Sequence, residues 1–414
     1  MRIPTFREAQ AEIATQLRDQ GYLAVVLVDL GALAQIEKSF GGAVFRSLRE
    51  QVDPLLQEMR EKFRGEDVLA RDESEGDRFL LFVGGPRRGA PFRSEQLRKL
   101  VDRLEEFLSA RVGRLTLPYL RERPQLGLGY GVVLWSPLES PERQVLRLVD
   151  EARACAEMRA KLRDRDQRER LVEIIQNREI WTAFQPIVSL ATGERLGWEA
   201  LSRGPRGSEI ELPLLLFGRA ARFGLTEELE RACRRQAFAD WRLLAQTGRL
   251  FVNTVPATVR DTSFMGRGVL DYLGAGLAPS AVTLEITERH VIENLSLYRE
   301  AMQSFTDLGF SFAIDDVGAG HSGLETVAVL RPAYLKIDIG LVRDVHLKRV
   351  SQQVLRAIMD MGDGLGATVI AEGIQTKEEH EALSELGVRW GQGYYLARPV
   401  DPYAEPKAPT SPPS

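Results

Sequence analysis

VTLEITE (282–288), FAIDD (312–316) and YLKID (334–338) are three short apolar runs that each end on charged residues. Each has the length of one strand, and helix-length stretches separate them. Five further runs in the second half of the chain carry a polar residue at or near their carboxyl ends: FQPIV with Gln185, LGWEALSR with Glu199 and Arg203, LFVNT with Asn253, TVIAEG with Glu372, and RWGQGYY with Gln392. Polar residues at the carboxyl ends of strands that alternate with helices form the mouth of a (β/α)8 barrel, where such folds place their chemistry. The series predicts an α/β barrel with one shared site.

The shared site is rich in carboxylates, and it contains no histidine. Carboxylates about 4 Å apart repel each other by roughly 4 kcal/mol per pair at an effective dielectric constant near 20, unless cations sit between them. Oxygen ligands select Mg²⁺ or Mn²⁺ over zinc. The neighbours Asp315 and Asp316 suit two ions, and two ions about 3.5–4 Å apart are suited to in-line attack on a phosphodiester. Lys336 could hold the attacking water or neutralise phosphate charge, and Arg203 could bind a phosphate oxygen.

Taken singly, these residues have structural explanations. Asp-Asp before Val-Gly is typical of a turn or a helix cap. Glu199 could lie on a surface helix, and Lys336 could protect an edge strand from pairing. Equivalent positions on successive strands favour the shared site over these explanations.

The same stretches closely resemble the EAL-domain family of cyclic di-GMP phosphodiesterases. The resemblance covers residues 171–400, and it rests on these motifs: EALSR (199–203), the Asn253 strand end, LEITE (284–288), DDVGAGHSG (315–323), LKID (335–338), AEGIQT (371–376) and GQGYYLARP (391–399). It implies hydrolysis of cyclic di-GMP to linear pGpG by two Mg²⁺ or Mn²⁺ ions. A receptor that binds cyclic di-GMP without turnover is the alternative, and the complete acidic set argues against it.

The resemblance also implies a role for each residue. The metal ligands would be Glu199, Asn253, Glu285, Asp315, Asp316 and Glu372. Lys336, Gln392 and Glu372 would serve catalysis, Glu288 would brace the loop after Asp316, and Gln185, Arg203 and Asp338 would contact the substrate. In that loop Val317, Ala319, His321 and Gly323 replace the commonest residues of the family, which leaves the rate and the dimer coupling in question.

The first half of the chain resembles a degenerate GGDEF domain of the diguanylate cyclases. Strand-like runs at 22–30, 77–85 and 126–135 alternate with helical stretches, and EGDRF (75–79) stands at the place of the family's defining motif. Arg78 replaces the glutamate that would bind a metal there. Cyclase activity is therefore not expected, although Asp29 and Asp77 leave GTP binding open. A run of helix-forming residues from 142 to 178 follows, with opposite charges at helical spacing, and it suits either a solvated surface helix or a rigid connector.

These readings predict four segments: a GGDEF-like regulatory domain (1–162), a connecting helix (163–180), the EAL domain (171–403) and a disordered tail (404–414) rich in proline. We expect a homodimer in which the first domain controls the activity of the barrel through the connecting helix. The loop 315–323 is expected to respond to movement of this helix, because its glycines permit movement.

The composition excludes several other classes of protein. A net charge of -4 offers no basic surface for nucleic acid. The two cysteines, Cys155 and Cys233, are far apart and form no disulfide or zinc pattern. The first residues, MRIPTFREAQAEIATQ, lack the apolar core of a signal peptide, and no apolar run nears the ~20 residues of a membrane span. A cytoplasmic location is the expectation.

Overall fold

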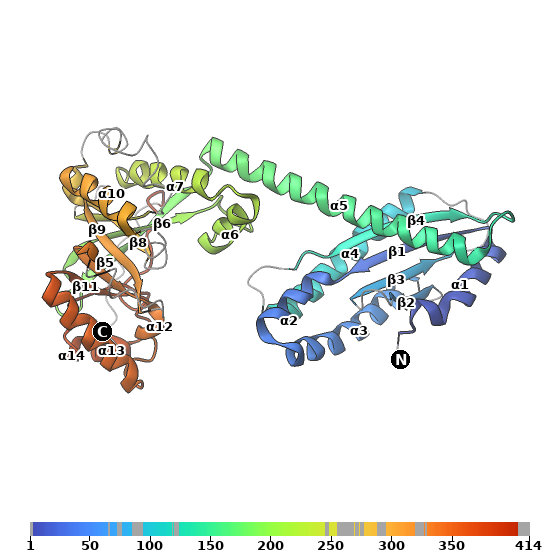
Figure 1. Ribbon diagram of the computed structural model, residues 1–414, viewed down its shortest axis with the longest axis horizontal. Helices are drawn as coiled ribbons and strands as arrows, with labels where there is room; N and C mark the ends of the chain where they lie inside the picture. The colour runs from blue at the N-terminus through green and yellow to red at the C-terminus, as the bar shows by residue number, and fades with distance from the viewer. Residues whose placement is uncertain are drawn as a thin grey trace. The chain divides into compact units, whose positions relative to one another are not determined.

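The computed structural model (Figure 1) describes residues 3–64, 67–72, 77–84, 94–117, 119, 124–244, 248–254, 269, 273, 277–287, 295–318, 327 and 329–404. The chain divides into two compact units, Met1–Glu169 and Arg170–Ser414. No helix in the described ranges is both long and apolar enough to cross a membrane.

The first unit is built on an antiparallel sheet with the strand order β2-β3-β1-β4. The strands are β1 (Tyr22–Asp29), β2 (Val68–Arg71), β3 (Arg78–Val83) and β4 (Gly127–Leu134). The helices are α1 (Phe6–Gln20), α2 (Ala34–Phe40), α3 (Gly42–Arg64), α4 (Ser94–Thr116) and α5 (Pro141–Asn177), with a 3₁₀ turn at Gly31–Leu33. Strand β2 was not predicted. The helical stretch after β1 is divided at Gly41, whose φ of 85° ends α2.

Both faces of this sheet are covered. Side chains of β1 alternate between the faces, so Leu23, Val25 and Leu27 pack in one apolar cluster with α1 and α5, and the alternate residues pack in another with α2, α3 and α4. A sheet buried on both faces accounts for the uninterrupted apolar run of β1.

Helix α5 is a single helix of 37 residues, and Figure 1 draws it as one continuous ribbon. It lies directly on β4, where a Cβ added to Gly129 would be 2.1 Å from the carbonyl oxygen of Ala152. Ion pairs from Arg153 to Asp72 (2.6 Å) and from Arg159 to Glu105 (2.9 Å) join α5 to the rest of the unit. The first part of α5 is therefore a packed element of this unit and not a free surface helix.

The second unit is a closed barrel of eight strands, in the order β10-β11-β12-β5-β6-β7-β8-β9. The strands are β5 (Trp181–Ser189), β6 (Arg195–Arg203), β7 (Arg249–Asn253), β8 (Val282–Thr287), β9 (Ser311–Val317), β10 (Tyr334–Ile337), β11 (Thr368–Ala371) and β12 (Trp390–Gly391). The described helices are α6 (Pro213–Phe223), α7 (Thr226–Trp241), α10 (Leu295–Asp307), α12 (Ile339–Val342), α13 (Arg349–Leu365) and α14 (Lys377–Glu385). The expected barrel is confirmed.

One strand differs from the expected arrangement. β5 runs antiparallel to both of its neighbours, β6 and β12, while the other adjacent strands are parallel. Its amino end, at Trp181, therefore lies at the mouth. The prediction that Gln185 reaches the site from a carboxyl end was wrong, because the sequence of one strand does not show its direction in the sheet.

Candidate active site

Side chains of alternate residues in a strand lie on the same face of the sheet. In this barrel the side chains that point inward form two layers. The lower layer is apolar, and Ile187, Phe251, Ala313, Tyr334 and Ile370 form one buried cluster. The polar residues of the site stand two positions from these on the same strands, toward the mouth: Gln185, Asn253, Asp315, Lys336 and Glu372. The apolar layer closes the barrel interior below the polar one.

Lys336 is the centre of the polar layer, and its side chain is 0% exposed. Its Nζ lies 2.6 Å from Glu372 Oε1 and 2.7 Å from Glu285 Oε1. Nζ also lies 3.1 Å from Glu199 Oε1 and 3.4 Å from Asp315 Oδ1. The explanation of Lys336 as an edge-strand residue is wrong, because β10 pairs on both sides and its lysine points into the barrel.

Gln392 is also buried and joins the same carboxylates. Its Nε2 donates to Glu199 and, at 3.2 Å, to Glu372 Oε1. Its backbone N–H donates to Ala371 O at 2.9 Å, which fixes the residue beside the end of β11. The structure thus brings together Glu199, Glu285, Asp315, Glu372, Lys336 and Gln392.

The buried carboxylates share one electrostatic environment. Burial raises the pKa values of Glu285, Glu372 and Asp315, and the charge of Lys336 opposes this effect. Burial lowers the pKa of Lys336, but the surrounding carboxylates outweigh that and raise it overall. One ammonium group therefore faces an excess of acidic groups, which disfavours full ionisation without further positive charge.

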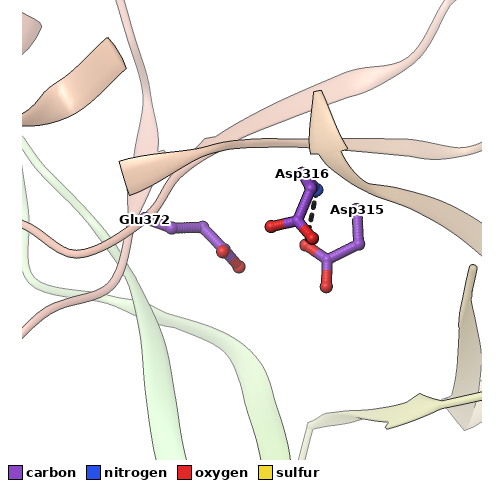
Figure 2. Close-up of side chains that lie close together, drawn as sticks. All are labelled: Asp315, Asp316 and Glu372. Carbon is purple, nitrogen blue, oxygen red and sulfur yellow. Dashed lines mark hydrogen bonds between the residues drawn. The ribbon is translucent and has the colours of Figure 1, made fainter. Parts of the chain in front are cut away.

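Asp315, Asp316 and Glu372 each offer an oxygen to a common point, and these oxygens lie within 4.8 Å of one another. Figure 2 shows the three side chains directed toward one another. Asp316 has a left-handed backbone (φ 59°), and its N–H donates to Asp315 Oδ1 at 3.0 Å. Burial and the neighbouring Asp315 raise the pKa of Asp316 to about 6. An acidic, oxygen-only donor set of this kind fits Mg²⁺ or Mn²⁺.

The remaining predicted residues take different places. Asn253 is exposed at the end of β7, in register with Glu285. Gln185 is in register with Glu199, and its Nε2 donates to Ala397 O at 3.0 Å. Arg203 is half-buried and donates to the carbonyls of Leu201 and Ser202, and Asp338 accepts from Gly340 N at 2.8 Å at the start of α12. Glu288, Ala319, His321 and Gly323 lie outside the described residues.

A pocket of about 260 Å³ borders this site, and the sequence patterns did not reveal it. It lies between the mouth ends of β6 and β7 and the helices α6 and α7, and Asn253 is part of its lining. Glu230 and the buried Arg234, both on α7, also line it. Burial raises the pKa of Glu230 to about 7, and its buried Oε2 has no hydrogen-bond partner among the described residues. Both residues belong to an ordinary charged helix in the sequence, so only their burial distinguishes them.

The first unit contains an ion pair at the end of β1, between Asp29 and Arg78. Arg78 Nε lies 2.7 Å from Asp29 Oδ2, and Gly31 N donates to Asp29 Oδ1 at 2.7 Å. Both carboxylate oxygens of Asp29 are therefore engaged by the protein itself.

Comparison with known proteins identifies the second unit. The model of the EAL domain family matches residues 167–399, more than half of the chain. The chain therefore belongs to the EAL domain family. Over 240 residues it is 29% identical to the probable cyclic di-GMP phosphodiesterase PdeN of Escherichia coli K12, covering 56% of this chain and 45% of that protein.

Two further similarities extend beyond the EAL domain. Over 402 residues the chain is 26% identical to the uncharacterised protein Rv1354c of Mycobacterium tuberculosis H37Rv, covering 92% of this chain and 62% of that protein. The chain thus spans less than two thirds of the length of either relative, 62% of Rv1354c and 45% of PdeN. The structure of the EAL enzyme Bd1971 in its cAMP-bound form is 26% identical, with a TM-score of 0.53, and covers 66% of this chain and 78% of that one.

Proposed function

We propose that the EAL domain of this protein hydrolyses cyclic di-GMP to linear pGpG, with two Mg²⁺ or Mn²⁺ ions. The observation that carries the proposal is the convergence of Asp315, Asp316 and Glu372 next to the buried group around Lys336. Membership of the EAL domain family and the similarity to PdeN support the same activity.

Asp315, Asp316 and Glu372, together with Glu199, Glu285 and Asn253, are the residues that would hold the ions. When bound, the ions lower the pKa of a water molecule and stabilise the charge of the leaving oxygen. Lys336 and Gln392 keep Glu199 and Glu372 in fixed positions, so the ligands are arranged before substrate arrives. Lys336 also supplies positive charge beside the attacked phosphate, where negative charge develops.

The pocket beside Asn253 suits one guanine base of the substrate. A guanine presents two adjacent N–H donors on its pairing edge, and a carboxylate can accept from both. The buried Oε2 of Glu230 is an acceptor with no hydrogen-bond partner among the described residues. We assign Glu230 to this recognition.

The test is incubation of the purified protein with cyclic di-GMP and Mg²⁺ or Mn²⁺, with pGpG measured by chromatography. We expect turnover that stops with excess EDTA and returns with added metal, and no turnover by Glu199→Ala. Binding of cyclic di-GMP by the wild type without any pGpG would favour the receptor instead. Full activity in EDTA would exclude the two-metal mechanism.

We also propose that the first unit is a GGDEF-like domain without cyclase activity. The guanidinium of Arg78 forms an ion pair with the carboxylate of Asp29. Its positive charge would repel the cation that cyclisation of GTP requires. The segment 1–162 should therefore form no cyclic di-GMP from GTP and Mg²⁺. Product formation by this segment would contradict the assignment, and binding of GTP without turnover would not.

A further inference from the structure

The last described segment of the chain, residues 397–403, crosses β5 beside the site, and we name it the C-terminal strap. Phe184 N donates to Val400 O at 2.9 Å, and Val400 N donates to Phe184 O at 2.7 Å. The next residue of β5, Gln185, donates its side-chain Nε2 to Ala397 O. The strap therefore determines where the amide of Gln185 lies, and Gln185 stands opposite Glu199 in the site.

An ion pair fixes the end of the strap. Arg206, in the loop after β6, donates to both carboxylate oxygens of Asp401, at 2.5 and 2.8 Å. Its guanidinium carbon lies 4.0 Å from the ring centroid of Trp181 and 5.6 Å from that of Tyr403. The Arg206 side chain is 50% exposed, but its planar guanidinium binds the carboxylate through two hydrogen bonds and stacks on aromatic rings, a geometry that a lysine cannot adopt.

A buried carboxylate fixes the strap a second time. The hydroxyl of Tyr403 donates to Asp240 Oδ1 at 2.5 Å, and Asp240 is 0% exposed on α7. The other oxygen of Asp240 accepts from the backbone N–H of Thr182 at 2.8 Å. We name Arg206, Asp401, Tyr403 and Asp240 the anchor.

The anchor contacts the start of β5, close to the junction between α5 and the barrel. Trp181 and Thr182 begin β5, and only three residues separate them from the end of α5 at Asn177. Among these three, Arg178 has a left-handed backbone (φ 55°), Glu179 pairs with Arg170 of α5 at 2.5 Å, and Ile180 is buried in one cluster with Leu171 and Ile174. This junction has little freedom to move without moving the start of β5.

We propose that the C-terminal strap positions Gln185 for the substrate and links the α5–β5 junction to the active site. The proposal rests on the proposed function and names a regulatory route for the same site. A displacement of α5 would first move Trp181 and Thr182. These residues contact the anchor, and the anchor holds the strap that binds Gln185. This route uses residues 178–206, 240 and 397–403, and it does not need the loop 315–323.

The test compares Arg206→Ala, Asp401→Ala and the double variant in the full chain. The family resemblance assigns Gln185 to the substrate, and its Nε2 donates to Ala397 O at the strap. We therefore expect KM for cyclic di-GMP to rise about tenfold, with kcat changed less than about threefold. Both substitutions break the Arg206–Asp401 ion pair, and Arg206→Ala also removes the stacking on Trp181 and Tyr403, so the double variant should raise KM no further than the more affected single variant. Lys348→Ala, which removes an exposed pair with Asp344, is the control and should leave KM unchanged.

A purely structural role would give a different result. In that case the melting temperature falls, but KM stays at the wild-type value at temperatures where each variant is fully folded by circular dichroism. That outcome would overturn the proposal. Tyr403→Phe removes a single hydroxyl, and it serves as the mild variant if the others fold poorly. We expect it to raise KM about threefold, and an unchanged KM in folded Tyr403→Phe would count equally against the strap.

The two proposals fail in distinguishable ways. A wild-type protein that neither binds nor hydrolyses cyclic di-GMP refutes the proposed function and the strap with it. A wild-type protein that hydrolyses cyclic di-GMP, with variants of unchanged KM, refutes the strap alone.

Discussion

Lys336 is one buried cation among four carboxylates, so its removal changes both stability and chemistry. Taking away one partner of a buried ion pair costs about 3–5 kcal/mol, because the remaining charge is left uncompensated. We expect Lys336→Met to reduce kcat at least about a hundredfold and to lower the melting temperature in EDTA. Lys377→Met, which removes an exposed pair with Glu381, should change neither.

The effect of metal ions on the melting temperature provides a second test of the role of Lys336. Divalent ions should raise the melting temperature of Lys336→Met more than that of the wild type, because the ions then supply the missing positive charge. Thermal melting with and without Mg²⁺ measures the difference. An equal shift in both proteins would show that the ions do not bind among these carboxylates.

Glu230 gives a prediction about pH. Its pKa of about 7 in the folded protein lies above its ordinary value of 4.5, so the protonated form favours folding. This contribution is complete below the ordinary pKa and is lost as the pH rises through about 7. We therefore expect the melting temperature of Glu230→Gln, relative to the wild type, to increase from about pH 5 to about pH 8. Glu381→Gln, on the exposed face of α14, is the control, and a pH-independent offset for Glu230→Gln would contradict the assignment.

Among the elements, α5 depends on a close approach to β4. A side chain at position 129 would overlap the backbone of α5, since even a Cβ would come within 2.1 Å of Ala152 O and 2.4 Å of Ala156 N. We expect Gly129→Val to destabilise the first unit by at least about 3 kcal/mol, measured by chemical denaturation. Gly364→Ala on α13 is the matched control, because nothing lies within 4 Å of its added Cβ. It should be neutral or stabilising, by about 1 kcal/mol at most.

At the scale of the whole molecule, the chain forms two units, and α5 contains the boundary between them at Glu169–Arg170. We expect a homodimer whose phosphodiesterase rate per site differs between the full chain and a 163–414 segment. Gly129→Val in the full chain should shift the rate in the same direction as the deletion, because both eliminate the contact between α5 and β4. Rates come from pGpG formation, folding from circular dichroism, and oligomeric state from light scattering. Equal rates and equal oligomeric states would mean that the first unit does not regulate the second.

The sequence alone was sufficient to predict the barrel and most of its acidic site. Strand alternation places Asp315, Lys336 and Glu372 two positions above the apolar residues of the lower layer, and this period is visible in any single strand. The direction of β5, and with it the position of Gln185, required the closed sheet, because pairing partners far apart in the chain decide it. The same holds for the four contacts of Lys336, for the pocket with Glu230, and for the strap that joins Asp401 and Tyr403 to residues about 160–200 positions earlier. Local periodicity determines which face a side chain takes, and only the folded chain determines which distant side chains meet there.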